Sequence, residues 1–241
     1  MHILNKEKVM KFLIFPLVLL ILGTTSALAR DPLIGLLTLP EVLGEGPCDD
    51  FSPEEILLYS GMDKKLSSGV IKVDKFWTFP DVGGCEGLTV NVHTEDGQRV
   101  RALLTKEYRY EAPAAIVLET RNNWYKLDTF EGPLWVQGTK NNQYYSLEYL
   151  LLNHMVFIKS GSGISILNQP NGLDSIAIVS SSDTIKVTET GMLSNQLWLN
   201  VQVMSGSECE SLEKPKVLSE GWMPAHTPSG ELTTWFYSRG C

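Results

Sequence analysis

The feature that most limits the possible folds is a succession of short segments rich in β-branched and aromatic residues. Turn-forming sequences such as "EDGQ", "RNN", "EGP" and "KNN" separate these segments. Short strands at such regular spacing are typical of small barrels and sandwiches, so we expect a mainly β fold. The predicted strands lie at residues 69–79, 87–94, 114–120, 123–130 and 134–138, and then within 164–167, 175–180, 183–189, 197–204, 221–226 and 233–240.

Two segments depart from this strand pattern. Residues 146–155 carry leucines at helical spacing and predict one short helix. Residues 52–61, "SPEEILLYSG", fit either a helix that starts at the Ser-Pro pair or a turn leading into a strand. The sequence "KSGSG" at 159–163 is typical of a linker and places a domain boundary there.

The two halves of the chain have similar patterns. Residues 55–74 and residues 164–183 each read as a strand, a polar turn with glycine and a second strand. Further on, residues 122–138 and residues 195–226 each contain an aromatic strand followed by a strand with a tryptophan near its start. The first half differs by an insertion at about residues 75–113. We therefore expect an internal repeat.

The tryptophan-bearing strands "NWYKL" and "LWLNV", followed by "PLWVQ" and "GWMPA", resemble bacterial SH3-like domains of exported proteins. The resemblance implies two tandem small SH3-like β-barrels, the first with the long insertion and the short helix. With the boundary at the linker, residues 30–158 form the first predicted domain and residues 159–241 the second. Members of this group bind cell-wall peptides or proteins and share no catalytic residues, so the resemblance carries over no catalytic residue.

The N-terminus has the three parts of a secretory signal peptide. Three lysines precede an apolar run at 12–23, and Ala27 and Ala29 occupy the small-residue positions of a cleavage site. Residues 1–29 are therefore predicted to be removed on export to the periplasm or the cell exterior, with Met1 or Met10 as the start. An uncleaved membrane anchor is the alternative, although the run is shorter than the roughly 20 residues that span a bilayer.

The four cysteines, Cys48, Cys85, Cys209 and Cys241, all follow the predicted cleavage site. An even number in an exported chain indicates disulfides. Proximity in the sequence favours Cys48–Cys85 and Cys209–Cys241, one bridge for each half, and the second would fasten the C-terminus. Free buried thiols are the alternative, and no Cys-x-x-Cys or Cys/His spacing indicates a zinc site.

The net charge of −8 argues against nucleic acid and anionic membrane surfaces as partners. The sequence has no Gly-x-Ser-x-Gly, His-Glu-x-x-His or phosphate-binding glycine motif. We expect neither catalysis nor a metal or other cofactor. A hydrolase that combines His93 or His154 with carboxylates is a remote alternative.

Aromatic residues gather in each half and are the candidate ligand-binding residues. An exposed aromatic groove suits an extended peptide or a sugar ring, whereas the same side chains could instead fill the cores. The candidates are Trp124, Tyr125, Trp135, Trp222, Trp235, Tyr237 and Arg239. The sequence thus predicts a non-catalytic exported protein that binds a cell-wall peptide or a protein, with a structural module of an envelope complex as the alternative.

Overall fold

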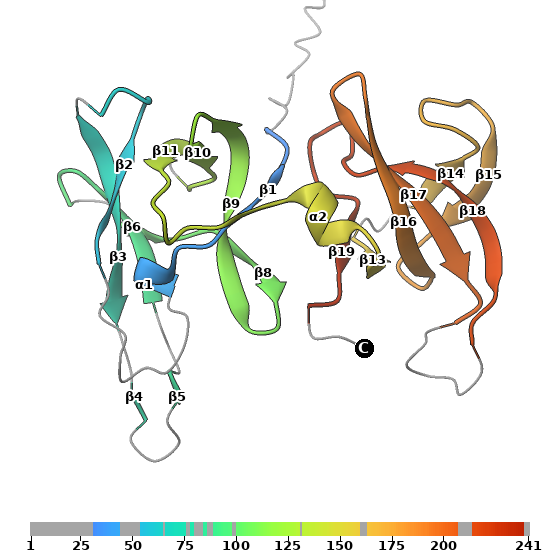
Figure 1. Cartoon of the computed structure of the whole chain (residues 1–241), viewed down its shortest axis with the longest axis horizontal. Helices are drawn as coiled ribbons and strands as arrows, with labels where there is room; N and C mark the ends of the chain where they lie inside the picture. The colour runs from blue at the N-terminus through green and yellow to red at the C-terminus, as the bar shows by residue number, and fades with distance from the viewer. Residues whose placement is uncertain are drawn as a thin grey trace, which may run out of the picture.

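The computed structural model shows a mainly β protein with two antiparallel sheets and two short helices (Figure 1). The mainly β prediction is therefore confirmed. The described residues are 31–43, 54–64, 66–75, 78–79, 84–85, 89–97, 100–130, 132–159, 163–206 and 214–238.

The first sheet has the strand order β12-β1-β9-β10-β11-β2-β3-β6-β7, and β8 adds to it by pairing with β9. A separate two-stranded hairpin comprises β4 (Thr78–Phe79) and β5 (Gly84–Cys85). The strands of the first sheet are β1 (Gly35–Leu37), β2 (Ile56–Tyr59), β3 (Ser67–Lys75), β6 (Thr89–Thr94), β7 (Val100–Ala102), β8 (Thr105–Arg109), β9 (Ala112–Arg121), β10 (Trp124–Leu127), β11 (Leu134–Gln137) and β12 (Tyr144–Ser146).

The second sheet has the order β15-β14-β18-β17-β16-β13-β19. Its strands are β13 (Met155–Ile158), β14 (Ile164–Leu167), β15 (Ser175–Val179), β16 (Thr184–Leu193), β17 (Gln196–Met204), β18 (Val217–Pro224) and β19 (Thr234–Phe236). In the part of the chain that is described, neither sheet returns to its first strand, so neither is a closed barrel.

The two sheets repeat one topology. The order β12-β1-β9-β10-β11-β2-β3 corresponds strand for strand to β19-β13-β16-β17-β18-β14-β15. The correspondence extends to register, because Trp135 of β11 lies opposite Tyr59 of β2, as Trp222 of β18 lies opposite Leu167 of β14. Strands β4–β8 stand between β3 and β9, at the place of the insertion in the first half.

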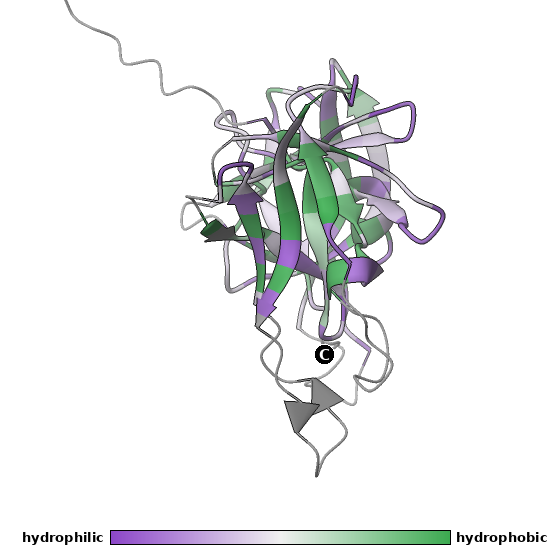
Figure 2. Cartoon of the chain, turned by 90° about the vertical axis from the view of Figure 1, so that its left-hand side faces the viewer, coloured by the Kyte–Doolittle hydropathy of each residue, from purple (hydrophilic) through white to green (hydrophobic). Residues whose placement is uncertain are grey.

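Strands β1 and β9 have both faces buried and form a wall between two hydrophobic cores. Leu36 packs in the core of the second sheet, and its neighbour Leu37 packs in the core of the first. Ala114 and Ala115 of β9 divide in the same way. The two halves are therefore joined through a shared layer. Figure 2 shows hydrophobic residues along the middle of the strands and hydrophilic residues in the connections.

A short helix, α2 (Leu147–Leu151), leads from the first sheet to the second. Ser146 caps it, since the Tyr149 backbone N–H donates to Ser146 Oγ at 3.2 Å. Its buried leucines, Leu147, Leu150 and Leu151, belong to the core of the second sheet. The helix predicted within 146–155 is thus confirmed, and it is shorter than the pattern because Leu152 leaves the helical conformation (φ −61°, ψ 131°).

Two further predictions, for residues 52–61 and for the boundary between the halves, can be compared with individual elements of the structure. Residues 56–59 form strand β2, which settles the choice in favour of the strand for that part of 52–61. The chain passes from the first sheet to the second at α2. Strand β13 (155–158) already pairs with β16 and β19 of the second sheet, so this change of sheet comes before the predicted linker at 159–163. A short helix that the sequence pattern did not indicate, α1 (Pro40–Leu43), buries Val42.

Several predicted features lie outside the described residues. They are the signal peptide at 1–29, Cys48, Cys209, Cys241, Arg239 and the side chain of Cys85, whose backbone belongs to β5. Within the described part, no helix has the length and apolar character needed to cross a bilayer.

Candidate functional site

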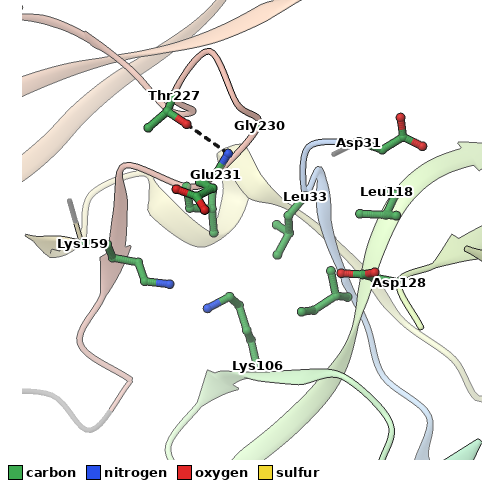
Figure 3. Close-up of a pocket in the computed structure, with 11 residues that line it drawn as sticks. Asp31, Leu33, Lys106, Leu118, Asp128, Lys159, Thr227, Gly230 and Glu231 are labelled. Atoms are coloured by element: carbon green, nitrogen blue, oxygen red, sulfur yellow. Dashed lines mark hydrogen bonds between the residues drawn. The ribbon is translucent and has the colours of Figure 1, made fainter. Parts of the chain in front are cut away.

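A cavity of about 490 Å³ opens between the two halves of the molecule (Figure 3). Its apolar part comes from Leu33 ahead of β1, from Ile116 and Leu118 of β9, and from Leu232 ahead of β19. Its polar part carries side chains from both halves. The lining residues are Asp31, Leu33, Lys106, Ile116, Leu118, Asp128, Lys159, Thr227, Gly230, Glu231 and Leu232.

Two lysines reach into this cavity from separate elements. Lys106 lies on β8, opposite Ala114 of β9, so the insertion of the first half supplies it. Lys159 follows β13, and its backbone N–H donates to the Thr233 carbonyl at 2.9 Å. Figure 3 shows the two ammonium groups pointing toward one another. The insertion of the first half and strand β13 of the second half therefore bring two positively charged side chains close together in the cavity.

The surroundings of Lys106 disfavour the protonated, positively charged form of its side chain. Burial, together with the positive charge of Lys159, lowers the pKa of Lys106 to about 8 from its ordinary 10.5. The ring of Trp235 lies 4.8 Å from the Lys106 nitrogen and provides a cation–π contact. Among the described residues, neither lysine forms an ion pair with a carboxylate. This arrangement favours an anion that would bridge the two ammonium groups.

Carboxylates lie elsewhere around the same cavity. Asp128 follows β10 and is buried, with its backbone N–H donating to the Ile116 carbonyl at 3.0 Å. Asp31 pairs with Lys126 at 2.9 Å. Figure 3 places both on the side of β9 and Glu231 on the side of the opposite turn. The cavity therefore offers acidic groups as well as the lysine pair.

The turn that carries Glu231 is fixed by hydrogen bonds within it. The Gly230 N–H donates to the Thr227 carbonyl at 2.9 Å, and the Thr227 N–H donates to the Glu231 carbonyl at 2.8 Å. Gly230 has a φ of 86°, a backbone conformation that residues with a Cβ atom rarely adopt. The turn thus holds Glu231 at the rim in a defined backbone geometry.

A second cavity of about 420 Å³ shares Lys106 with the first. It is more aromatic, and the ring of Phe157 lies 5.2 Å from that of Tyr237. Ser238 Oγ donates to Glu107 Oε2 and ties the end of β19 to β8. The lining residues are Thr105, Lys106, Glu107, Phe157, Trp235, Phe236, Tyr237 and Ser238. The two cavities adjoin at Lys106, one polar and one aromatic.

The structure distributes the predicted aromatic residues over three places. Trp235 and Tyr237 come together in the aromatic cavity, Trp235 buried and Tyr237 49% exposed. Trp222 is half-buried on β18, where its ring lies beside Gly191. The remaining described candidates belong to the first sheet.

In the first sheet, Trp124 is buried, and its ring lies nearly perpendicular to that of Tyr59, with the centroids 5.6 Å apart. Trp135 is also buried and lies opposite Tyr59 in the register of β2 and β11. Tyr125 packs on the first core, with its ring 5.6 Å from that of Tyr144. These three side chains line neither of the two cavities described above.

Sequence reasoning did not find Lys106, Lys159, Asp128 or Glu231. They come from four separate segments, and each is an ordinary charged residue in its local pattern. The one available signal was the position of Lys106 within the insertion of the first half. These four residues line one cavity only because β8 of the first half lies beside the second half near β19. Local sequence patterns do not predict such long-range packing.

His93 and Asp74 form a surface pair on β6 and β3. His93 Nε2 lies 2.8 Å from Asp74 Oδ2, and Asn91 also donates to that carboxylate. Although burial opposes it, hydrogen bonding to Asn91 and His93 lowers the pKa of Asp74. Neither residue lines either cavity, so this pair carries no catalytic argument.

Comparison of the chain with protein families, curated proteins and solved structures found no match.

Proposed function

We propose that the chain is a non-catalytic exported binding protein built from two SH3-like modules, and that it binds a peptide with a free carboxylate in the cavity between them. A cell-wall peptide is the leading ligand class. The observation that carries the binding proposal is the pair of lysines, Lys106 and Lys159, that face one another without a carboxylate partner among the described residues.

The repeated topology supports the view that both halves are copies of one module. In each copy, two tryptophans occupy equivalent register positions, Trp124 and Trp135 in the first and Trp198 and Trp222 in the second. We take each copy as an SH3-like module because its tryptophan-bearing strands resemble those of SH3-like domains in sequence. The assignment to that fold remains part of the proposal.

The chemistry of the cavity favours a ligand with several functional groups. A carboxylate between two ammonium groups gains charge-assisted hydrogen bonds and relieves the repulsion between them. Glu231 offers an acceptor for an amine of the same ligand, and the adjoining aromatic cavity with Trp235 accommodates an apolar side chain. Short peptides combine these three groups in one molecule.

The test is the binding of the purified chain to soluble cell-wall peptides, measured by titration calorimetry, and to insoluble peptidoglycan, measured by co-sedimentation. We expect the double variant Lys106→Gln, Lys159→Gln to lose about 10-fold or more in affinity, because it removes both charges that face the carboxylate. We expect a peptide with an amidated carboxylate to bind the wild type with a similar loss.

The matched control is Lys140→Gln, which removes one positive charge from an exposed turn outside the cavity. It should bind as the wild type does. Equal affinity of the double variant and the wild type, or failure of the wild type to bind any of these peptides, would contradict the proposal.

A further inference from the structure

Lys106 lies where the two cavities meet, and among the described lining residues it is the one that they share. On the polar side, its amino group points toward the amino group of Lys159 (Figure 3). On the aromatic side, its nitrogen lies 4.8 Å from the centroid of the Trp235 ring, and Phe157 and Tyr237 line the same cavity. A molecule attached to this nitrogen could therefore place one group beside a cation and another among aromatic rings.

The same position favours the unprotonated form of Lys106, which is the nucleophilic form of an amine. The residue is half-buried, and the apolar side chains of Leu33 and Ile116 line the cavity that it faces. Burial, the charge of Lys159 and a hydrogen bond between the two amino groups lower its pKa to about 8. The cation–π contact with Trp235 opposes this shift without cancelling it. At pH 8, about half of the Lys106 side chains therefore carry a free amine.

The acidic residues of the polar cavity do not neutralise the lysine pair. Asp31 pairs with a lysine of β10 at 2.9 Å. In the part of the chain that the structure describes, neither Asp128 nor Glu231 forms an ion pair with Lys106 or Lys159. Lys159 is exposed, so its ammonium group is accessible to an incoming anion. A carboxylate is the group that this ammonium would bind most strongly.

We propose that Lys106 reversibly binds the carbonyl carbon of a 2-oxo acid with an apolar side chain, as an imine. The carboxylate of this ligand pairs with Lys159, and its side chain enters the aromatic cavity beside Tyr237. The inference concerns the same cavity as the peptide binding proposed above, but it does not depend on a peptide, because a 2-oxo acid supplies its own carboxylate.

Imine formation needs no oxidant, reductant or metal. The lone pair of the neutral Lys106 nitrogen attacks the carbonyl carbon, a C–N bond forms, and the carbonyl π electrons move to the oxygen. In the resulting carbinolamine, the nitrogen lone pair forms a C=N bond as the C–O bond breaks. The oxygen leaves as water with the two protons of the original amine. The reverse reaction with water releases the ligand unchanged, so the step is a covalent form of binding.

The arrangement of the two cavities favours a 2-oxo acid over a simple aldehyde. In a 2-oxo acid, the carbonyl carbon is bonded directly to both the carboxylate and the side chain. Once this carbon is attached to Lys106, the two groups diverge from the place where the polar and aromatic cavities meet. An aldehyde without a carboxylate would leave the charge of Lys159 uncompensated and would use only one of the cavities.

Reductive trapping tests the proposal. The purified chain is incubated at pH 7.5 with phenylpyruvate and sodium cyanoborohydride, which reduces an imine to a stable secondary amine, and the adducts are located by mass spectrometry of proteolytic peptides. We expect the adduct at Lys106 to form about 10-fold faster, or more, than the adduct at the exposed Lys140, because the free amine is the reacting form.

Three variants separate the contributions. Lys159→Gln should slow the adduct at Lys106 by about 10-fold with phenylpyruvate, because it removes the partner of the carboxylate and the charge that disfavours protonation of Lys106. Tyr237→Ala should lower the rate with phenylpyruvate by about 5-fold relative to the rate with pyruvate, which has no ring to place. A general loss of structure would not change this ratio. Lys140→Gln is the matched control and should react at Lys106 as the wild type does.

The outcomes distinguish this inference from the proposed function. An adduct at Lys106 that forms no faster than at Lys140, or a rate that Lys159→Gln leaves unchanged, would overturn the inference, even if calorimetry shows that cell-wall peptides bind. A fast adduct at Lys106 in a chain that binds no peptide would support the inference and contradict the proposed function.

Discussion

Lys106 is a charged side chain in a partly buried position beside a second lysine. Burial and the charge of Lys159 lower its pKa, and its ammonium group makes a cation–π contact with the ring of Trp235. Charged groups in such positions are frequent at binding sites. The repulsion that lowers the stability of the free protein is relieved when an oppositely charged ligand binds, and this increases the affinity for the ligand. The residue therefore links the proposed binding with a measurable property of the free chain.

We predict that Lys106→Met stabilises the free protein by about 1–2 kcal/mol at pH 7, after allowance for solvent screening. In the wild type, the folded state releases the Lys106 proton near pH 8, whereas the unfolded state retains it up to about pH 10.5. The unfolded state binds more protons in this window, so this group makes the wild type more stable as the pH rises from 8 to 10.5. The advantage of the variant should shrink over the same range.

Urea denaturation of both proteins at pH 7, 8.5 and 10 measures this difference. The Lys140→Gln variant, which changes an exposed lysine, serves as the control. A Lys106→Met variant less stable than the wild type at pH 7 would show that the cation–π contact with Trp235 outweighs the burial of the charge.

At the scale of elements, α2 is the joint between the sheets. It is a helix of five residues, too short to be stable alone, so the Ser146 cap and the three buried leucines hold it in place. Ser146 also belongs to β12 and lies opposite Gly35 of β1. One residue thus ends a strand of the first sheet and begins the helix that leads to the second.

We predict that Ser146→Ala destabilises the protein by about 1 kcal/mol, because the Tyr149 N–H loses its acceptor. Ser146→Asp, which retains an acceptor at the cap, should remain close to the wild type. Thermal and urea unfolding measure both variants. Equal loss in the two would mean that the side chain matters through its packing at β12 and not through the cap.

The elements that could be predicted are those with strong local patterns. In β17, Leu197, Leu199, Val201 and Val203 alternate and all pack in the core, as their spacing indicates. The strands on either side of the two polar turns near residues 60–66 and 168–174 pair as hairpins, β2 with β3 and β14 with β15. Their β-branched residues and the glycine-containing turns predict this arrangement. The insertion seen in the sequence contains the strands β4–β8.

The elements that could not be predicted depend on distant partners. Strand β1 has three residues, and the continuous apolar run around it gives no period, because both of its faces are buried. Strands β8 and β12 are short and half-buried. The lysine pair was missed for the same reason, since Lys106 and Lys159 become neighbours only when β8 lies beside the second half.

At the scale of the whole molecule, the wall formed by β1 and β9 makes the two halves interdependent. A hydrogen bond crosses the junction, from His226 in the second half to the Leu33 carbonyl ahead of β1, with a distance of 2.9 Å. Because a carbonyl can only accept, Nε2 is the donor, which is consistent with a neutral imidazole. Burial lowers the pKa of His226, although this hydrogen bond opposes the shift.

We predict that acid weakens the fold partly through His226. The unfolded chain takes up a proton on this residue near pH 6.5, whereas the folded chain does so at lower pH. The unfolded state therefore binds more protons as the pH falls below 6.5, and this group reduces stability there. Between pH 7 and 5, the free energy of unfolding should fall less steeply in His226→Gln than in the wild type.

Urea denaturation at intervals between pH 5 and 8.5 separates this effect from the titration of carboxylates, which both proteins share. The two stability curves should run parallel above pH 7.5 and converge below 6.5. Curves that remain parallel throughout would exclude a contribution from His226.

The central place of β1 also affects when the protein can fold during synthesis. Residues 35–37 leave the ribosome well before their partners, which are residues 115–117 in β9 and 144–146 in β12. The nascent chain must therefore carry this apolar stretch uncovered until residue 146 has emerged. A chaperone that recognises exposed leucines would meet its binding site here, at Leu36 and Leu37, and would be displaced by the arrival of β9 and β12.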